Sequence, residues 1–209
     1  MIRIENLSHS YAPDIKITFP NWEINTGEKW LLGGQSGSGK STLLHILTGI
    51  LKPSAGIVSL DNVSLYDLSA RKLDQFRAQK IGIIFQKAHF IKSLTLKENL
   101  MVAQSFAGFK VDGNRIKSVL GSLGIDSKLN AFPDQLSQGQ LQRASIARAV
   151  INKPSLLIAD EPTSSLDDNN TFIVLDLLKS QSELNGSTLV VATHDQRVKE
   201  AFHLSYQLV

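Results

Sequence analysis

Short apolar runs alternate along this chain with longer stretches in which apolar residues recur at helical spacing. Runs of this length, separated by turn residues such as those at 25–27 and 53–56, are typical of buried β-strands. Their alternation with helical segments predicts an α/β domain with a largely parallel sheet. The candidate strands are Trp30–Leu32, Ile57–Leu60, Ile81–Phe85, Leu156–Asp160 and Thr188–Thr193.

The pattern differs in two regions. The opening segment, in which Ile2, Ile4, Ile15, Ile17 and Phe19 are the apolar positions, predicts antiparallel strands. From about residue 88 to residue 150 the pattern is mostly helical, with glycines between the helical stretches. We interpret this region as a helical subdomain inserted between two strands of one sheet. The predicted organisation is one domain over residues 1–209, with a core of 1–88 and 151–209 and a helical subdomain of 89–150.

Composition narrows the function classes only slightly. The chain has 209 residues, 42% of them hydrophobic and 20% charged, as is ordinary for a globular protein, and its net charge is +3. This balance suits an anionic small ligand and does not demand nucleic acid. The absence of cysteine excludes disulfides and cysteine-ligated zinc. No stretch has the roughly 18 apolar residues needed to cross a bilayer, so we expect a soluble chain whose membrane role comes through a partner.

The strongest motif is G-Q-S-G-S-G-K-S at 34–41, which matches the phosphate-loop pattern in full and lies between a predicted strand and a helical pattern. Glycines let backbone N–H groups turn inward around phosphate oxygens, and the following helix points its positive end at the same anion. Lys40 would reach the terminal phosphates, and the Ser41 hydroxyl would bind Mg²⁺. A Gly/Ser-rich turn before a helix is the alternative. The predicted phosphate-binding residues are Gly34, Gln35, Ser36, Gly37, Ser38, Gly39, Lys40, Ser41 and Thr42.

A second motif, L-L-I-A-D-E at 156–161, ends a buried strand in two acidic residues. We expect Asp160 to hold Mg²⁺ through water, and Glu161 to polarise the water that attacks the γ-phosphate. Taken alone, a strand that ends in a solvated acidic turn explains the same residues. The preceding phosphate loop favours the catalytic interpretation.

The segment L-S-Q-G-Q at 136–140 predicts the start of a helix. Ser137 and Gln140 have the spacing of a capping box, in which side chains and backbone satisfy each other's open hydrogen-bond donors. Gly139 then lies in the first helical turn, where glycine costs up to about 1 kcal/mol relative to alanine. Helix capping explains Ser137 and Gln140 but leaves Gly139 unexplained.

Six motifs in this order resemble the nucleotide-binding subunit of ABC transporters, across residues 11 to 194. They are the phosphate loop at 34–41, F-Q at 85–86, L-S-Q-G-Q at 136–140, the acidic strand at 156–161, S-S-L-D at 164–167 and T-H-D at 193–195. The resemblance implies a single ABC ATPase domain with a P-loop NTPase (RecA-like) core, an antiparallel β subdomain and an inserted helical subdomain. It also implies ATP and Mg²⁺ as ligands.

The same resemblance assigns roles to single residues. Gln86 would offer its amide oxygen to Mg²⁺ or to the attacking water, His194 would donate to the γ-phosphate, and Tyr11 would stack on adenine. Taken alone, each has a structural explanation: a surface glutamine, a loop histidine and a tyrosine covering the edge of the sheet. The implied catalytic residues are Glu161, His194, Gln86 and Lys40, the implied Mg²⁺ ligands are Ser41, Gln86 and Asp160, and the further nucleotide contacts are Tyr11, Ser137, Gly139, Gln140 and Asp167.

In such proteins the working unit is implied to be two subunits, head to tail. Each ATP would lie between the phosphate loop of one subunit and the signature helix of the other, and Gly139 would let backbone N–H groups approach that ATP. Gln138 departs from the glycine that is commonest at its position in the family. The implied partners are a second copy and an integral membrane permease, with no nucleic acid, and the implied location is cytoplasmic, peripheral on the inner face of the cell membrane.

The stretch at 77–100 resembles the short ATPases of the lipoprotein-release and macrolide-exporter type, whose relatives include a cell-division ATPase. We expect no additional C-terminal regulatory domain, since the sequence ends soon after His194. Two alternatives remain: a regulatory ABC ATPase of a cell-division membrane complex, and an ABC ATPase that acts on DNA or ribosomes. The second is disfavoured by the single cassette, the ordinary insert and the lack of cysteine.

Overall fold

The computed structural model describes residues 1–12, 14–35, 37–164 and 167–208, apart from the side chains of residues 168, 169 and 196. It contains two five-stranded sheets. The first is antiparallel, with the order β2-β1-β5-β6 and with β3 also paired to β1. Its strands are β1 (Ile2–Ala12), β2 (Ile15–Thr18), β3 (Trp22–Ile24), β5 (Ala55–Leu60) and β6 (Val63–Ser64).

The second sheet is parallel throughout, with the order β10-β4-β9-β8-β7. All five residues of β9 and the first four of β8 are buried, as expected for strands covered on both faces. The strands are β4 (Lys29–Gly34), β7 (Ile81–Ile84), β8 (Leu156–Asp160), β9 (Thr188–Ala192) and β10 (Leu204–Leu208).

One strand was predicted in the wrong sheet. Ile57–Leu60 was expected among the parallel strands, but it forms the end of β5 and pairs antiparallel with β1, Leu60 opposite Ile2. The apolar run identified a strand correctly, but it carries no information about the direction of the neighbouring strand.

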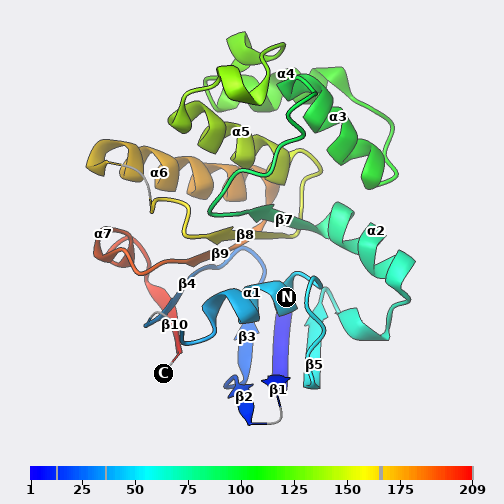
Figure 1. Cartoon of the computed structure of the whole chain (residues 1–209), viewed down its shortest axis with the longest axis vertical. Helices are drawn as coiled ribbons and strands as arrows, with labels where there is room; N and C mark the ends of the chain where they lie inside the picture. The colour runs from blue at the N-terminus through cyan, green and yellow to red at the C-terminus, as the bar shows by residue number, and fades with distance from the viewer. Residues whose placement is uncertain (13, 36, 165–166, 209) are drawn as a thin grey trace.

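A helix lies between the two sheets. α1 (Lys40–Leu47) buries Leu43, Leu44 and Ile46 in a core that includes residues of β1, β4 and β8. In Figure 1 the antiparallel sheet lies below α1, and the parallel sheet lies between α1 and the helices α5 and α6. The other elements outside the helical subdomain are η1 (Leu65–Asp67), α2 (Ala70–Lys80), α6 (Asp168–Asn185) and α7 (Gln196–Lys199).

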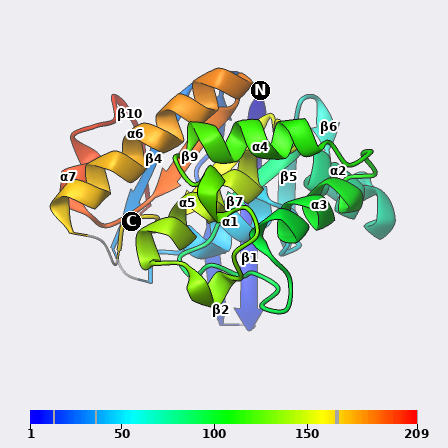
Figure 2. The same cartoon turned by 90° about the horizontal axis from the view of Figure 1, so that it is seen from above.

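The helical segment lies between β7 and β8, which are adjacent in the parallel sheet. Figure 2 shows its helices gathered in front of the strands, with α4 nearest the viewer. The fold class is therefore the expected one: a parallel core, an antiparallel β subdomain and an inserted set of helices. No helix of the described residues is long and apolar enough to cross a membrane. The inserted elements are α3 (Leu96–Phe106), α4 (Gly113–Ser122), η2 (Asp126–Lys128), η3 (Pro133–Gln135) and α5 (Gln138–Val150).

Candidate active site

The phosphate loop joins the end of β4 to the start of α1. Gly39 caps the helix with φ +94°, a left-handed conformation that favours glycine. At Gly34, φ is +151°, and a Cβ would lie 2.4 Å from the Ser38 Oγ and 2.9 Å from the backbone oxygen of Leu208. The fold therefore requires glycine at both positions. The resulting turn directs the N-terminus of α1 toward the loop, where an anion would be stabilised.

Lys40 is held over this loop by the loop itself. Its Nζ donates hydrogen bonds to the backbone oxygens of Gly34 and Gln35, both at 2.9 Å. The Ser38 hydroxyl is buried without a hydrogen-bond partner among the described residues. Ser36 lies outside the described residues. Phosphate oxygens can replace the carbonyl oxygens as acceptors for Lys40, because a charge-assisted hydrogen bond to phosphate is stronger than one to a neutral carbonyl.

Asp160 lies at the end of β8, facing the start of α1. Its Oδ2 accepts a hydrogen bond from the Ser41 hydroxyl at 3.3 Å. Burial raises the pKa of Asp160, and the hydrogen bond from Ser41 opposes that rise. A partly desolvated carboxylate beside a hydroxyl fits a hard cation, which would compensate the lost hydration. The described residues contain no group of three or more His, Cys, Asp or Glu that could hold a metal alone. Mg²⁺ here would therefore take most of its ligands from phosphate and water.

Glu161 and His194 lie at the ends of adjacent strands and are in contact. Glu161 has φ +48°, unusual for a residue with a side chain, and its N–H donates to the Ala192 oxygen at 2.8 Å. Its carboxylate accepts from the Thr193 hydroxyl at 2.9 Å and from the His194 backbone N–H at 3.2 Å. The His194 Nδ1 lies 2.7 Å from the same carboxylate. Strained backbone of this kind gathers at active sites.

Gln86 follows β7 and reaches the loop after Glu161. Its Nε2 donates to the Ser164 hydroxyl at 3.4 Å. Two residues of the S-S-L-D motif, Ser165 and Leu166, lie outside the described residues. Asp167 caps α6 by accepting from the Asn170 backbone N–H at 2.9 Å. A structural role for Asp167 is thus visible, and its contact with nucleotide stays a prediction.

Tyr11 lies near the end of β1, beside the first turn of α1. Its hydroxyl is 2.8 Å from the Thr42 Oγ1, and the His9 ring packs against its ring edge to face at 4.6 Å. The side chain is 58% exposed, so the ring is accessible to a ligand. Stacking on adenine stays a prediction.

The signature segment, Leu136–Gln140, begins α5 with the predicted capping box. The Gln140 N–H donates to the Ser137 Oγ at 3.3 Å, and the Ser137 N–H donates to the Gln140 Oε1 at 3.0 Å. Gly139 is different from the phosphate-loop glycines: its φ is not positive, and a Cβ there would meet nothing within 4 Å. No hydrogen bond found among the described residues joins this segment to the phosphate loop of the same chain.

Two further residues belong to the site and were not expected from the sequence. Thr193, which orients Glu161, lies inside the T-H-D motif, so its position next to His194 was an available signal. Gln142 donates from Nε2 to the Pro162 oxygen at 2.9 Å, which joins the signature helix to the turn after Glu161. A glutamine on a helix has no distinctive sequence signal.

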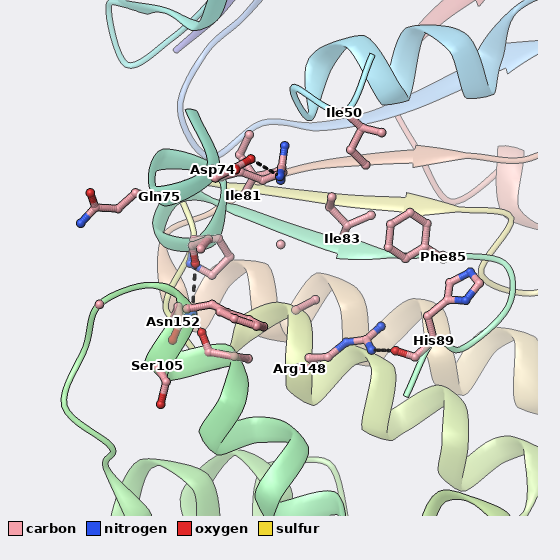
Figure 3. Close-up of a pocket in the computed structure, with 18 of the residues that line it drawn as sticks. Ile50, Asp74, Gln75, Ile81, Ile83, Phe85, His89, Ser105, Arg148 and Asn152 are labelled. Carbon is pink, nitrogen blue, oxygen red and sulfur yellow. Dashed lines mark hydrogen bonds and ion pairs between the residues drawn. The ribbon is translucent and has the colours of Figure 1, made fainter. Parts of the chain in front are cut away.

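A groove of about 860 Å³ opens between α2, β7, α3 and α5 (Figure 3). Arg148 on its wall donates to the His89 backbone oxygen and lies 4.6 Å from the Phe90 ring. Burial lowers the pKa of Arg148, and none of the ion pairs found in the described part of the chain gives it a carboxylate. Phe106, at the rim, is 76% exposed.

Comparisons with known proteins identify the family of this chain. The family model for ABC transporters matches residues 18–164. The lipoprotein-releasing system ATP-binding protein LolD of Buchnera aphidicola subsp. Schizaphis graminum is 42% identical over 183 residues, which cover 86% of this chain and 80% of LolD. The methionine import ATP-binding protein MetN 1 of Oceanobacillus iheyensis is 40% identical and covers 95% of this chain, which spans 60% of MetN 1.

Among solved structures, the dimeric ABC transporter cassette MJ0796 has a TM-score of 0.89 and 35% identity, covering 100% of this chain and 94% of its own. The same cassette has also been solved in a post-hydrolysis state with ADP and Pi. The family model, the relatives and the solved structures all indicate the same family. The chain belongs to the ABC transporter family, as one of its ATP-binding and ATP-hydrolysing subunits.

Proposed function

We propose that two copies of this chain bind head to tail on ATP, each ATP lying between the phosphate loop of one copy and the signature helix of the other. Gly139 carries the proposal. Its own chain gives no reason for a glycine, since the backbone is ordinary helix and a Cβ would meet nothing. A phosphate that approaches the N-terminus of α5 from a second copy supplies that reason, because a bare Cα lets backbone N–H groups come close. The similar cassette MJ0796 has been solved as a dimer, which supports an assembly of two copies.

The geometry supports a simple division of labour in hydrolysis. Water attacks the γ-phosphorus in line, the bond to the bridging oxygen breaks, and Glu161 takes the proton of the attacking water. Thr193 and the His194 backbone hold the Glu161 carboxylate in place for this. Because the His194 Nδ1 faces the Glu161 carboxylate, Nε2 is the ring atom left for the γ-phosphate, and it would donate there in the imidazolium form, in which both ring nitrogens carry a proton.

Ser41 and Asp160, with Gln86 as the expected third contact, are the residues that would hold Mg²⁺. The ion would neutralise charge on the β- and γ-phosphates. Lys40 would leave the backbone oxygens of Gly34 and Gln35 for those phosphates. The chain would thus exchange internal hydrogen bonds for bonds to ATP.

We further propose that the partner is a membrane permease of the lipoprotein-release or macrolide-export type, seated in the groove of Figure 3. The similarity to LolD supports the type, whereas MetN 1 is named for import. The groove combines the exposed Phe106 with Arg148, a partly buried cation for which no carboxylate partner is found among the described residues. A short permease segment with apolar side chains and an acidic group would complement both.

Glu161→Gln tests the dimer. This variant keeps the shape of the side chain but removes the proton acceptor, so turnover should fall by about 10²- to 10⁴-fold, while ATP and Mg²⁺ convert the monomer to a stable dimer in light scattering. Glu183→Gln is the matched control, since Glu183 is 66% exposed and pairs only at the surface with Lys29. Wild-type turnover in Glu161→Gln would remove Glu161 as the base, and a monomer at saturating ATP would overturn the shared site.

The permease type is tested by co-reconstitution in lipid vesicles. A permease of the lipoprotein-release type should stimulate ATP turnover, and one of the methionine-import type should not. Phe106→Ser should weaken the stimulation and leave basal turnover unchanged, because Phe106 lies at the groove rim and not at the phosphate loop. Stimulation by the import permease alone would overturn the proposed type.

A further inference from the structure

One side-chain hydrogen bond joins the signature helix to the catalytic turn of the same chain. The Gln142 Nε2 donates to the backbone oxygen of Pro162 at 2.9 Å, in a partly buried position. Gln142 lies two residues beyond the signature segment, on α5. Pro162 follows Glu161 directly. The bond therefore connects the helical subdomain to the residue next to the proposed base.

The turn that receives this bond is under constraint from several sides. Glu161 is left-handed at φ +48°, and the Ser164 N–H donates back to the Glu161 oxygen at 3.3 Å. The buried Thr163 donates from its hydroxyl to Asp195 at 3.4 Å, which ties the turn to the segment after β9. The Gln142 hydrogen bond joins the same turn to the helical subdomain. A strained conformation persists only when its surroundings hold it, so the position of Glu161 depends on these contacts.

We propose that Gln142 is a positioning residue that couples the two ATP sites of the dimer. This inference rests on the head-to-tail arrangement proposed above. In that arrangement the N-terminus of α5 contacts the ATP held by the partner's phosphate loop, whereas Glu161 acts on the ATP of its own phosphate loop. A displacement of α5 when the partner's ATP binds reaches Gln142 within one helical turn, and Gln142 moves the turn that carries Glu161.

A hydrogen bond suits this role better than packing would. The Pro162 oxygen is an acceptor, and the Gln142 amide reaches it only while α5 and the turn keep one relative position. Thermodynamic linkage then requires that ATP in one site changes the properties of the other, and the reverse. The isolated subunit should therefore hydrolyse ATP with a Hill coefficient above one.

The experiment compares three single variants of the whole chain. Gln142→Met keeps the length and volume of the side chain but lacks the donor. Gln142→Lys restores a donor that can reach the Pro162 oxygen. Gln79→Met is the matched control, because the Gln79 Nε2 donates to the Ala107 oxygen at 2.7 Å, the same type of bond at a distance from the catalytic turn.

For Gln142→Met we expect ATP affinity of the dilute monomer within about twofold of wild type, since the phosphate loop is untouched. Turnover should fall about tenfold, because a small misplacement of a catalytic group costs that much or more. The Hill coefficient should fall below the wild-type value, because only ATP-driven dimerisation then remains as a source of cooperativity. Gln142→Lys should recover part of both, and Gln79→Met should change the melting temperature without changing either.

The proposal is overturned if Gln142→Met retains wild-type turnover and cooperativity, or if Gln79→Met lowers both to the same degree. The dimer assay separates this failure from a failure of the proposed function. If the Glu161→Gln variant dimerises on ATP and the Gln142→Met variant keeps wild-type turnover and cooperativity, only the coupling role of Gln142 is overturned. Glu161→Gln that stays monomeric removes the shared site on which the coupling role depends.

Discussion

The phosphate loop and the signature segment both contain glycine for phosphate contact, but the chain supports them differently. Gly34 and Gly39 adopt conformations that side chains disfavour, and Gly34 is hemmed in by Ser38 and Leu208. Gly139 has an ordinary helical backbone and open space around it. Contacts within the chain therefore determine the conformation of the phosphate loop. For the second region, the proposed contact with a second copy supplies the reason for the glycine.

This difference separates what one chain can do from what needs two. Lys40 and Glu161 both have partners inside the chain, so the phosphate loop and the catalytic turn are formed in the monomer. The helix that begins in the signature segment is also capped within the monomer. In the proposed arrangement, however, this segment faces away from the phosphate loop of its own chain. A monomer should therefore bind ATP, and only an assembly should turn it over efficiently.

Lys40→Ala gives the largest effect expected within one chain. It removes a charge-assisted contact worth about 1.5–3 kcal/mol, which is a loss of roughly 10- to 150-fold in ATP affinity. Isothermal titration of dilute monomer measures it, with Lys117→Ala on the exposed side of α4 as the control. Unchanged affinity would show that the loop does not bind the terminal phosphates through Lys40.

A pair of glycine substitutions separates the two regions directly. Gly34→Ala should lower the free energy of unfolding by about 1–3 kcal/mol, because φ +151° and the Ser38 contact oppose a Cβ. Gly139→Ala should raise it by up to about 1 kcal/mol, because alanine favours helix, and yet should lower turnover. Denaturant unfolding and ATPase assays measure both. A Gly139→Ala variant that is more stable and fully active would refute the need for a bare Cα.

Asp160→Asn should change how the melting temperature depends on pH. Burial raises the pKa of Asp160 above 3.8, so the folded state favours the protonated carboxyl. The ionised form lowers stability once pH rises through the folded pKa, and this difference vanishes below the unfolded pKa. The variant should therefore melt higher than wild type near neutral pH, with equal melting below about pH 4, while losing Mg²⁺-dependent turnover. Equal melting temperatures across the whole range would contradict a desolvated Asp160.

Gln138→Gly should have the smallest effect. Gln138 occupies the first position of α5, where the family most often has glycine, and we expect turnover to stay within a few-fold of wild type. Steady-state ATPase measurement decides this. Complete loss of activity would show that the Gln138 side chain makes an essential contact in the closed dimer. Position 138 would then be as restricted as Gly139.

Sequence patterns predicted the strands that are buried on both faces. β8 was expected with its observed limits, and β9 with an error of one residue, because continuous apolar runs specify such strands. β10 was not expected, although its apolar and polar residues alternate as in a half-buried strand. α2 was not expected either, because its apolar face is short: Leu73 and Phe76 pack against the core but are only partly buried.

The site residues likewise divide into those that the sequence could predict and those that depend on the folded arrangement. Motif spacing predicted the phosphate loop, Asp160, Glu161 and His194 as site residues, and the structure places all of them at or just after the ends of parallel strands. The contact between Glu161 and His194 depends on which strands are neighbours, which periodicity does not reveal. Gln142 was invisible for a further reason: its partner is a backbone oxygen, which any residue could offer.

The order of strands in the parallel sheet has a consequence for how the protein is made. β4 ends in the phosphate loop and lies between β10 and β9, both from the far end of the sequence (Figure 1). The first antiparallel sheet can pair from strands that all emerge early, whereas β4 waits for most of translation, at about 5–20 residues per second. A nascent chain would therefore complete the sheet around its nucleotide site only after β9 and β10 have been made.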